Sequence, residues 1–528
     1  MSHRKGCQLG LVPVAIVGMM TLMLPPTALR GQKPVALTDS LVSAVRDYRV
    51  THESQILREL TQLLSIPNLA SDRANILRNA ERIRTMLTER GVRARLLESD
   101  SGPPAVYGEL STEGATRTIV FYAHFDGQPV DRSQWLTPPW SPTLRDATIE
   151  AGGQEAKLPA QGDTVSGEAR LYSRSASDDK APIEAMLAAL DALRSAGRQP
   201  DVNLKFFFDG EEEAGSPHLR AMLDRYAEQL VADAWIFCDG PVHQSRLQQV
   251  VFGVRGTLDL EMTVYGPLRA LHDGHYGNWV PNPNAMLANL LASMRDSDGR
   301  IRIAGFGADV RRGTPAERAA IARIPAVERE LKLSLGLAWS EGAGESLVTT
   351  LMRPALNIRG VEGGHVGALA ANAIPTLARA SVDFRLVPDQ TPDGVRALVE
   401  KHLKKMGYFV VHADPDLQTR TDHARIVRLD WGAGYPGIRT PLELPVSRAV
   451  VRTIEDAVEG QLVVMPMLGG SLPMYVFKDM LNVPLIVVPI VNHDNNQHAA
   501  NENLRLQNLW DGIEVYAALM AGLGARWR

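Results

Sequence analysis

The hydrophobic pattern of the chain predicts short buried strands, each followed by an acidic or histidine-bearing segment. Apolar runs cover 118–123, 202–208, 234–238 and 483–491, lengths that favour strands over helices. The segments that follow contain, in chain order, His124-Phe125-Asp126, Glu211-Glu212-Glu213, Asp239-Gly240 and His498. Because open α/β sheets bind ligands at the carboxyl ends of their strands, this placement predicts a functional site at one sheet edge.

A helix is predicted directly after Ser177-Asp178-Asp179-Lys180. Asp178 or Asp179 is suited to cap its N-terminus, and Pro182 is suited to its first turn. Its apolar face consists of Ile183, Met186, Leu187, Leu190 and Leu193. Taken alone, Asp178 is an ordinary helix cap, but the neighbouring acidic segments favour a ligand role.

The pattern changes near Val251 to alternating apolar and polar positions. Strands are predicted over 258–264, 381–387 and 408–412, with helices from near Asn284 and over 392–406. This predicts an α/β catalytic domain, a mixed sheet flanked by helices, with a smaller α+β (ferredoxin-like) lid or dimerisation domain inserted. The expected domain ranges are 46–250 and 414–528 for the catalytic domain and 251–413 for the insertion. Residues 414–444, rich in Pro, Gly and charge, are expected to form a loop back to the first domain.

Composition excludes several classes of protein. The 528 residues are 45% hydrophobic and 22% charged, enough for two domains with ordinary cores. A net charge of -4 without a basic tract argues against a nucleic-acid partner. The two cysteines, Cys7 and Cys238, leave no disulfide framework, and Cys238 is expected to be a small buried hydrophobe.

The N-terminus has the pattern of an export signal. Arg4 and Lys5 precede an apolar stretch over 9–24, which is shorter than the roughly 20 residues that a spanning helix needs. Residues 1–31 are therefore predicted to be a signal peptide, giving a periplasmic or secreted protein without stable membrane insertion. An uncleaved N-terminal anchor is the alternative.

The residue types at the strand ends suit a two-metal site. Two histidines and several carboxylates are the donors that a pair of Zn²⁺-like ions needs. One glutamate beyond the ligands can act as a general base, so the set predicts metal-assisted hydrolysis. Zn²⁺ is the first expectation for the two divalent ions, with Mn²⁺ and Co²⁺ as alternatives because they accept similar ligands.

Four motifs resemble the dizinc metallopeptidases that include carnosinase-type dipeptidases, glutamate carboxypeptidase, aminoacylase, acetylornithine deacetylase and succinyl-diaminopimelate desuccinylase. They are Tyr122-Ala-His-Phe-Asp-Gly-Gln-Pro129, Ser177-Asp-Asp-Lys180, Asp209-Gly-Glu-Glu-Glu-Ala-Gly-Ser216 and Leu271-His-Asp-Gly-His-Tyr-Gly277. The resemblance covers the chain from about residue 46 to its end. The second and third motifs are closer to the dipeptidase branch than to the deacylase branch. Ala181 and Asp273 depart from the family pattern, which has Gly and Ser there.

The resemblance implies a role for each residue of the site. It implies a hydroxide shared by two metals that attacks a peptide bond, with Glu212 as general base and Asp126 orienting His124. It assigns the five metal ligands as His124 and Asp239 on one ion, Glu213 and His498 on the other, and Asp178 between them.

The resemblance also implies groups for the substrate, a dipeptide or short peptide with a free C-terminus. His272 would stabilise the oxyanion, in a homodimer formed through the inserted domain. Arg385 would bind the substrate carboxylate through its bidentate fork, and Gly470 and Ser471 would donate backbone N–H groups to it.

Alternatives remain open from the sequence. His493 is the rival of His498, although His498-Ala-Ala-Asn-Glu502 fits the family's closing motif better. Ser177-x-x-Lys180 formally matches a serine nucleophile pattern, but the accompanying S-D-N and K-T-G motifs are missing from the sequence. An N-acyl amino acid deacylase with the same metal site is the main alternative function. A non-catalytic peptide-binding protein is the other, and the presence of Glu212 argues against it.

Overall fold

The computed structural model describes residues 37–528 except residue 471. The predicted signal peptide, 1–31, lies outside the described residues. None of the helices in the described part of the chain is both long enough and apolar enough to cross a membrane.

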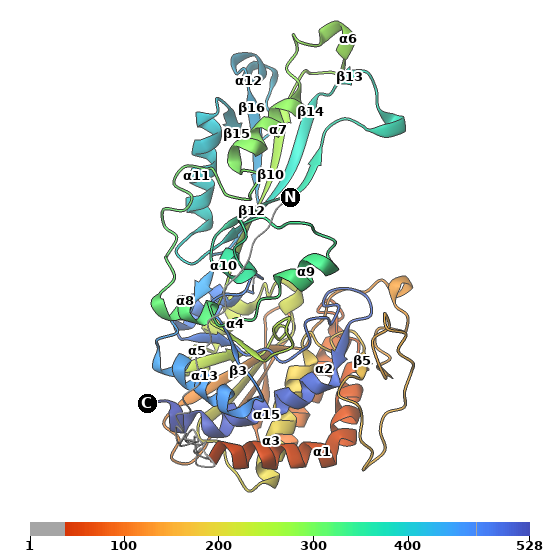
Figure 1. Ribbon diagram of the computed structural model, residues 1–528, viewed down its shortest axis with the longest axis vertical. Helices are drawn as coiled ribbons and strands as arrows, with labels where there is room; N and C mark the ends of the chain where they lie inside the picture. Colours follow the sequence, from red (N-terminus) through yellow and green to blue (C-terminus); the bar gives the residue numbers. More distant parts are fainter. Residues whose placement is uncertain (1–36, 471) are drawn as a thin grey trace, which may run out of the picture. The chain divides into compact units, whose positions relative to one another are not determined.

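An eight-stranded mixed sheet forms the centre of the larger core (Figure 1). Its order is β1 (Arg93–Leu97), β2 (Ala105–Leu110), β6 (Asn203–Asp209), β3 (Thr118–His124), β7 (Ala234–Phe237), β19 (Leu485–Val487), β8 (Gln249–Val251) and β18 (Val463–Met465). The four strands β6, β3, β7 and β19 run parallel to one another. These are the four predicted strands, and they are neighbours in the sheet.

Both faces of this sheet are covered by helices because its central strands are apolar on both sides. Phe121 and Phe206 face a core shared with the first group of helices, whereas Tyr122 and Phe207 face the second group. The first group is α1 (Leu37–Leu64), α2 (Arg73–Glu89), α3 (Lys180–Ser195), α13 (Pro445–Ala457) and α15 (Leu506–Gly522). The second includes α4 (Leu219–Arg225) and α14 (Met474–Leu481), with α5 (Ala227–Leu230) following α4.

The predicted helix after Ser177 is α3, and its five predicted apolar positions are all buried. One detail of the prediction is wrong. Asp179 holds the capping position, but its side chain makes no capping hydrogen bond and instead accepts one from the backbone N–H of His124 at 3.3 Å. The carboxylate is therefore directed to the strand end rather than to its own helix.

A small three-stranded sheet joins two distant segments. It consists of β4 (Thr143–Arg145), β5 (Arg170–Tyr172) and β20 (Asn503–Arg505), with β5 in the middle. Asn503 pairs with Tyr172 across the antiparallel β20–β5 ladder. The residues after β5 and those before β20 are consequently held beside each other, which determines part of the site below.

A second, five-stranded sheet has a hydrophobic core of its own. Its order is β12 (Ala355–Glu362), β14 (Leu377–Leu386), β10 (Gly256–Tyr265), β16 (Ile426–Trp431) and β15 (Phe409–Val411). Helices α7 (Pro283–Met294) and α11 (Pro392–Lys405) contribute to this core. The alternating apolar residues predicted over 258–264 are all buried in β10. The assignment of 251–413 to a separate domain stays a prediction.

The expectation of a loop over 414–444 is wrong for part of its length. Residues 417–422 form α12 (Leu417–Asp422), and β16 pairs with β10 and β15 in the second sheet. Val427 and Leu429 are buried there, and Trp431 on the same strand face packs against this core. The alternation covers only five residues within a segment rich in Pro, Gly and charge, so the composition indicated a loop.

Several short elements complete the fold. They are β9 (Gly253–Val254), β17 (Ile438–Arg439), β11 (Leu271–His272), β13 (Ala373–Ile374), α6 (Asp273–Tyr276), α8 (Pro315–Ile321), α9 (Glu328–Ser334) and α10 (Leu347–Leu351).

Candidate metal centre

Three neighbouring strands deliver acidic and histidine side chains to one edge of the large sheet. His124 is the last residue of β3 and lies opposite Asp209, the last residue of β6, in the parallel ladder. Glu212 and Glu213 follow β6 in a 3₁₀ turn, Glu212–Ala214. Asp239 follows β7, which pairs with β3 on the other side. The predicted clustering at carboxyl ends of strands is therefore what the fold produces.

Two sets of ligand atoms form at this edge. His124, Asp178 and Asp239 make the first set, and Asp178, Glu213 and His498 make the second. Within each set the ligand atoms lie within 4.8 Å of one another. Each set offers imidazole nitrogen and carboxylate oxygen, the donors that suit Zn²⁺ and similar ions.

Asp178 belongs to both sets and presents a different oxygen to each. Its Oδ1 lies 2.9 Å from Nε2 of His124, and its Oδ2 lies 3.1 Å from Nε2 of His498. Nε2 of His498 is also 3.3 Å from Oε2 of Glu213. The carboxylate of Asp178 is thus placed to bridge two ions, as the resemblance implies.

Asp126 links the first set to the glutamate turn. Its side chain is fully buried, and Oδ1 lies 3.3 Å from Nδ1 of His124. It also accepts hydrogen bonds at 3.0 Å from the backbone N–H groups of Glu212 and Glu213, one on each oxygen. One carboxylate therefore orients the imidazole and fixes the turn that carries the two adjacent glutamates.

Burial and mutual repulsion raise the pKa of several of these carboxylates. Burial raises the pKa of Asp239 to about 6 and that of Glu213 to about 8, and it raises the pKa of Glu212 well above its usual value. Asp178 differs because hydrogen bonds from His124 and His498 outweigh its burial and lower its pKa.

This donor set fits two divalent ions. Among residues 37–528 other than 471, the ion-pair partners of Asp178, Asp239 and Glu213 are the two histidines, so imidazole is the only cationic group paired with this buried negative charge. Buried carboxylates in such a cluster are costly unless they are paired or coordinate metals. Metal ions at the two sets would remove that cost.

His498 belongs to the second ligand set, whereas its rival His493 does not. His493 is absent from both ligand sets of the described residues and lines a cavity with Pro241 and His243. His498 has a left-handed backbone conformation with φ of 62°, in a loop whose position only the fold reveals.

Two amides at the site were not anticipated from the sequence. Gln128 donates to Oε2 of Glu213 at 2.8 Å, and Gln497 donates to Oδ2 of Asp178 at 2.9 Å. Gln128 lies within the first motif and Gln497 directly precedes His498, but a glutamine by itself carries no signal that separates a ligand-contacting residue from a surface residue.

The residues predicted to bind the substrate belong to segments other than those that carry the two ligand sets. Arg385, on β14, donates from Nε to Asp383 at 3.0 Å. His272, at the end of β11, is 55% exposed and accepts a hydrogen bond from the backbone N–H of Gly274. The carbonyl of Gly470 accepts from the N–H of Arg255 at 3.3 Å, and Ser471 lies outside the described residues.

The fold and the two ligand sets that share Asp178 define a two-metal hydrolase. The model of Peptidase family M20/M25/M40 matches residues 120–522, and the chain belongs to this family. The predicted class, a metal-dependent peptidase-type hydrolase of mixed α/β fold, is thereby confirmed. Two metal ions, typically zinc, are the cofactors of the family, and the two ligand sets provide places for them.

Relatives match the chain over nearly its whole length. The Cys-Gly metallodipeptidase dug1 of Schizosaccharomyces pombe is 26% identical over 494 residues, covering 90% of this chain and 96% of the relative. The Beta-Ala-His dipeptidase of Homo sapiens is 24% identical over 542 residues, covering 97% and 98%. The structure of the M20 family metallo-carboxypeptidase Sso-CP2 from Sulfolobus solfataricus is similar with a TM-score of 0.70 at 27% identity, covering 89% of this chain and 99% of that one.

Proposed function

We propose that the protein hydrolyses the peptide bond of dipeptides or short peptides that have a free C-terminus. The observation that carries the proposal is the pair of ligand sets joined by Asp178, with Glu212 next to the ligand Glu213. The similarity to a Cys-Gly dipeptidase, a Beta-Ala-His dipeptidase and a carboxypeptidase supports short peptides as the substrate class.

His124 and Asp239 would hold one ion, Glu213 and His498 the other, and Asp178 both. When bound, two such ions supply Lewis acidity, which lowers the pKa of water and polarises an amide carbonyl. Asp126 keeps Nε2 of His124 directed at the first ion by holding Nδ1, at 3.3 Å.

Glu212 is the proposed proton carrier. Its side chain stands beside the ligand sets without belonging to either. It takes a proton from the attacking water and delivers it to the amine that leaves, which could not depart as an amide anion. Burial raises the pKa of Glu212, and a raised pKa suits a carboxyl group that must hold a proton between the two steps.

Residues outside the large sheet would recognise the substrate ends. Arg385 is oriented by its hydrogen bond to Asp383, and its guanidinium would bind the C-terminal carboxylate with backbone N–H groups of Gly470 and Ser471. His272 would stabilise the oxyanion. Its exposure is consistent with a role completed by the partner copy of a homodimer.

The test is release of amino acids from a panel of dipeptides and N-acetyl amino acids, with added Zn²⁺ or Mn²⁺ and again with a chelator. We expect metal-dependent cleavage of dipeptides. Cleavage of acyl amino acids alone would instead make the protein a deacylase with the same metal site. Metal-dependent cleavage of neither class would contradict both and favour a peptide-binding protein.

We also propose that the protein is exported, on the basis of the N-terminal sequence pattern. Cell fractionation together with N-terminal sequencing of the mature protein tests this. A full-length chain found only in the cytoplasm would contradict it.

A further inference from the structure

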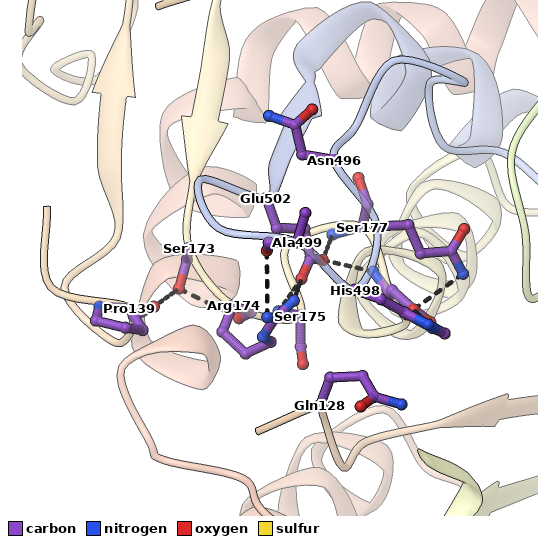
Figure 2. A network of polar contacts seen from close by, with 12 residues as sticks. Gln128, Pro139, Ser173, Arg174, Ser175, Ser177, Asn496, His498, Ala499 and Glu502 are labelled. Atoms are coloured by element: carbon purple, nitrogen blue, oxygen red, sulfur yellow. Dashed lines mark hydrogen bonds and ion pairs between the residues drawn. The ribbon is translucent and has the colours of Figure 1, made fainter. Parts of the chain in front are cut away.

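Glu502 connects the loop that carries Asp178 with the loop that carries His498 (Figure 2). It lies between His498 and β20, its side chain is fully buried, and its own backbone carbonyl accepts from the N–H of Ser173 at 3.1 Å. The β5–β20 ladder holds this position because Asn503 pairs with Tyr172.

The two carboxylate oxygens of Glu502 are fully occupied by donors. Oε1 accepts from the backbone N–H groups of Ser177 and Asp178, both at 2.9 Å. Oε2 accepts from the backbone N–H of Ser175 at 2.9 Å and from Nη1 of Arg174 at 2.7 Å. One of these four bonds is therefore to the main chain of the residue that bridges the two ligand sets.

Arg174 extends this contact toward His498. It is buried, and its guanidinium lies over the ring of Trp135 at 5.2 Å. Its Nη2 donates to the carbonyl of Ala499, the residue after His498, at 3.2 Å. The ion pair thus fixes the backbone at Asp178 on one side and the backbone beside His498 on the other.

Asn68 connects the loop over 173–178 to the segment over 124–126, which carries the ligand His124. Its Nδ2 donates at 2.8 Å both to the hydroxyl of Ser175 and to the carbonyl of Phe125, which lies between His124 and Asp126. Three chain segments that are far apart in sequence are consequently joined through the loop over 173–178.

We propose that Glu502, together with Arg174, is a positioning residue that holds Asp178 and His498 in the geometry for binding two metal ions. The inference rests on the metal ligands of the proposed function. Glu502 acts through the ligands, because its own oxygens have no lone pair left for an ion. Replacing residues that hydrogen-bond to metal ligands lowers metal affinity on the order of 10–100-fold.

Glu502→Gln is the informative substitution because it keeps the size of the side chain. A carboxamide has one oxygen and one NH₂, and both ends of the side chain face N–H donors. Whichever way the amide turns, its NH₂ group meets two donors, so the loop at Asp178 must shift. We expect the variant to bind both ions more weakly, by about 10–100-fold.

Arg174→Lys tests the other half of the pair. Lysine keeps the positive charge next to Glu502, but one ammonium group cannot reach both Glu502 and the carbonyl of Ala499. We expect it to weaken mainly the ion held by the set that contains His498, leaving the first ion bound. This variant also keeps the test decisive if Glu502→Gln does not fold.

Asp494→Asn is the matched control. Asp494 precedes His498 in the same loop and forms a bidentate pair with Arg170 at 2.9 and 2.8 Å, but it belongs to neither ligand set. The substitution removes a carboxylate–arginine pair similar to that of Glu502 and Arg174. If metal binding depended only on the general rigidity of the loop, Asp494→Asn would weaken it as well. We expect near wild-type metal affinity from it.

The measurement is titration of the metal-free protein with Zn²⁺ in competition with a chromogenic chelator, with metal content by mass spectrometry and folding checked by circular dichroism. Wild-type affinity for both ions in Glu502→Gln and Arg174→Lys would overturn the inference, as would equal weakening in Asp494→Asn. Asp178→Asn serves as reference. If it too retains both ions, the ligand assignment itself fails, whereas loss only in Asp178→Asn would refute the role of Glu502 alone.

Discussion

Replacing Glu212 by Gln separates proton transfer from metal binding. The side chain of Glu212 belongs to neither ligand set, and its backbone N–H bond to Asp126, at 3.0 Å, does not depend on the side chain. Glutamine has the same shape, so the 3₁₀ turn and the neighbouring ligand Glu213 stay in place. We therefore expect both metal ions to remain bound.

The expected loss lies in turnover. General acid–base groups contribute about 10²–10⁴-fold to rate, which corresponds to about 3–5 kcal/mol in the activation barrier. Glutamine can neither accept the proton of the attacking water nor return it to the leaving amine. We expect kcat to fall by this factor while KM changes by no more than a few-fold.

The assay is amino-acid release from the best dipeptide substrate, with metal content measured on the same sample. Glu213→Gln is the contrasting variant because Glu213 lies in the second ligand set, and it should lose metal together with activity. Loss of metal in Glu212→Gln, or a kcat within tenfold of wild type, would refute the role of Glu212 as proton carrier.

Three further predictions concern stability, metal and substrate. Burial raises the pKa of Glu184, whose two oxygens have no hydrogen-bond partner within the described part of the chain, so the folded state binds the extra proton. The charged neighbours of this carboxyl group are Glu59, Arg90, Asp191 and Arg82. The free energy of unfolding that this proton uptake contributes is then lost as the pH rises above the pKa of Glu184 in the unfolded chain, by at most about 1.4 kcal/mol per pH unit. Glu184→Gln should flatten this decline between pH 5 and 8 in denaturant unfolding, and parallel pH profiles would contradict it. Free Zn²⁺ at 100 times its dissociation constant should stabilise the fold by about 2.7 kcal/mol over the chelated protein in calorimetry, and an unchanged melting temperature would exclude a metal site. Arg385→Lys should lower kcat/KM about 10–100-fold for peptides with a free C-terminus but little for their C-terminal amides, and equal losses would contradict carboxylate binding.

The main strands and most of the candidate ligands could be predicted from the sequence because both are encoded locally. A buried strand requires an apolar run, and residues at the ends of parallel strands must meet at one edge. His124, Glu213 and Asp239 follow from this rule, since each stands at or just after such a run. The strand β16 escaped prediction because its short alternation of apolar and charged residues lies in a segment rich in Pro, Gly and charge, and because its burial comes from neighbours in the second sheet.

Only the tertiary structure decided how these groups face one another. That Asp178 presents one oxygen to His124 and the other to His498 depends on the packing of loops more than 300 residues apart in the chain. The same is true of Glu502, which the sequence shows only as the last residue of a motif, and of Asp126, whose two backbone contacts fix the glutamate turn. Sequence patterns specify elements and their ends through local periodicity, whereas hydrogen bonds between distant loops depend on how the sheet and its helices pack together.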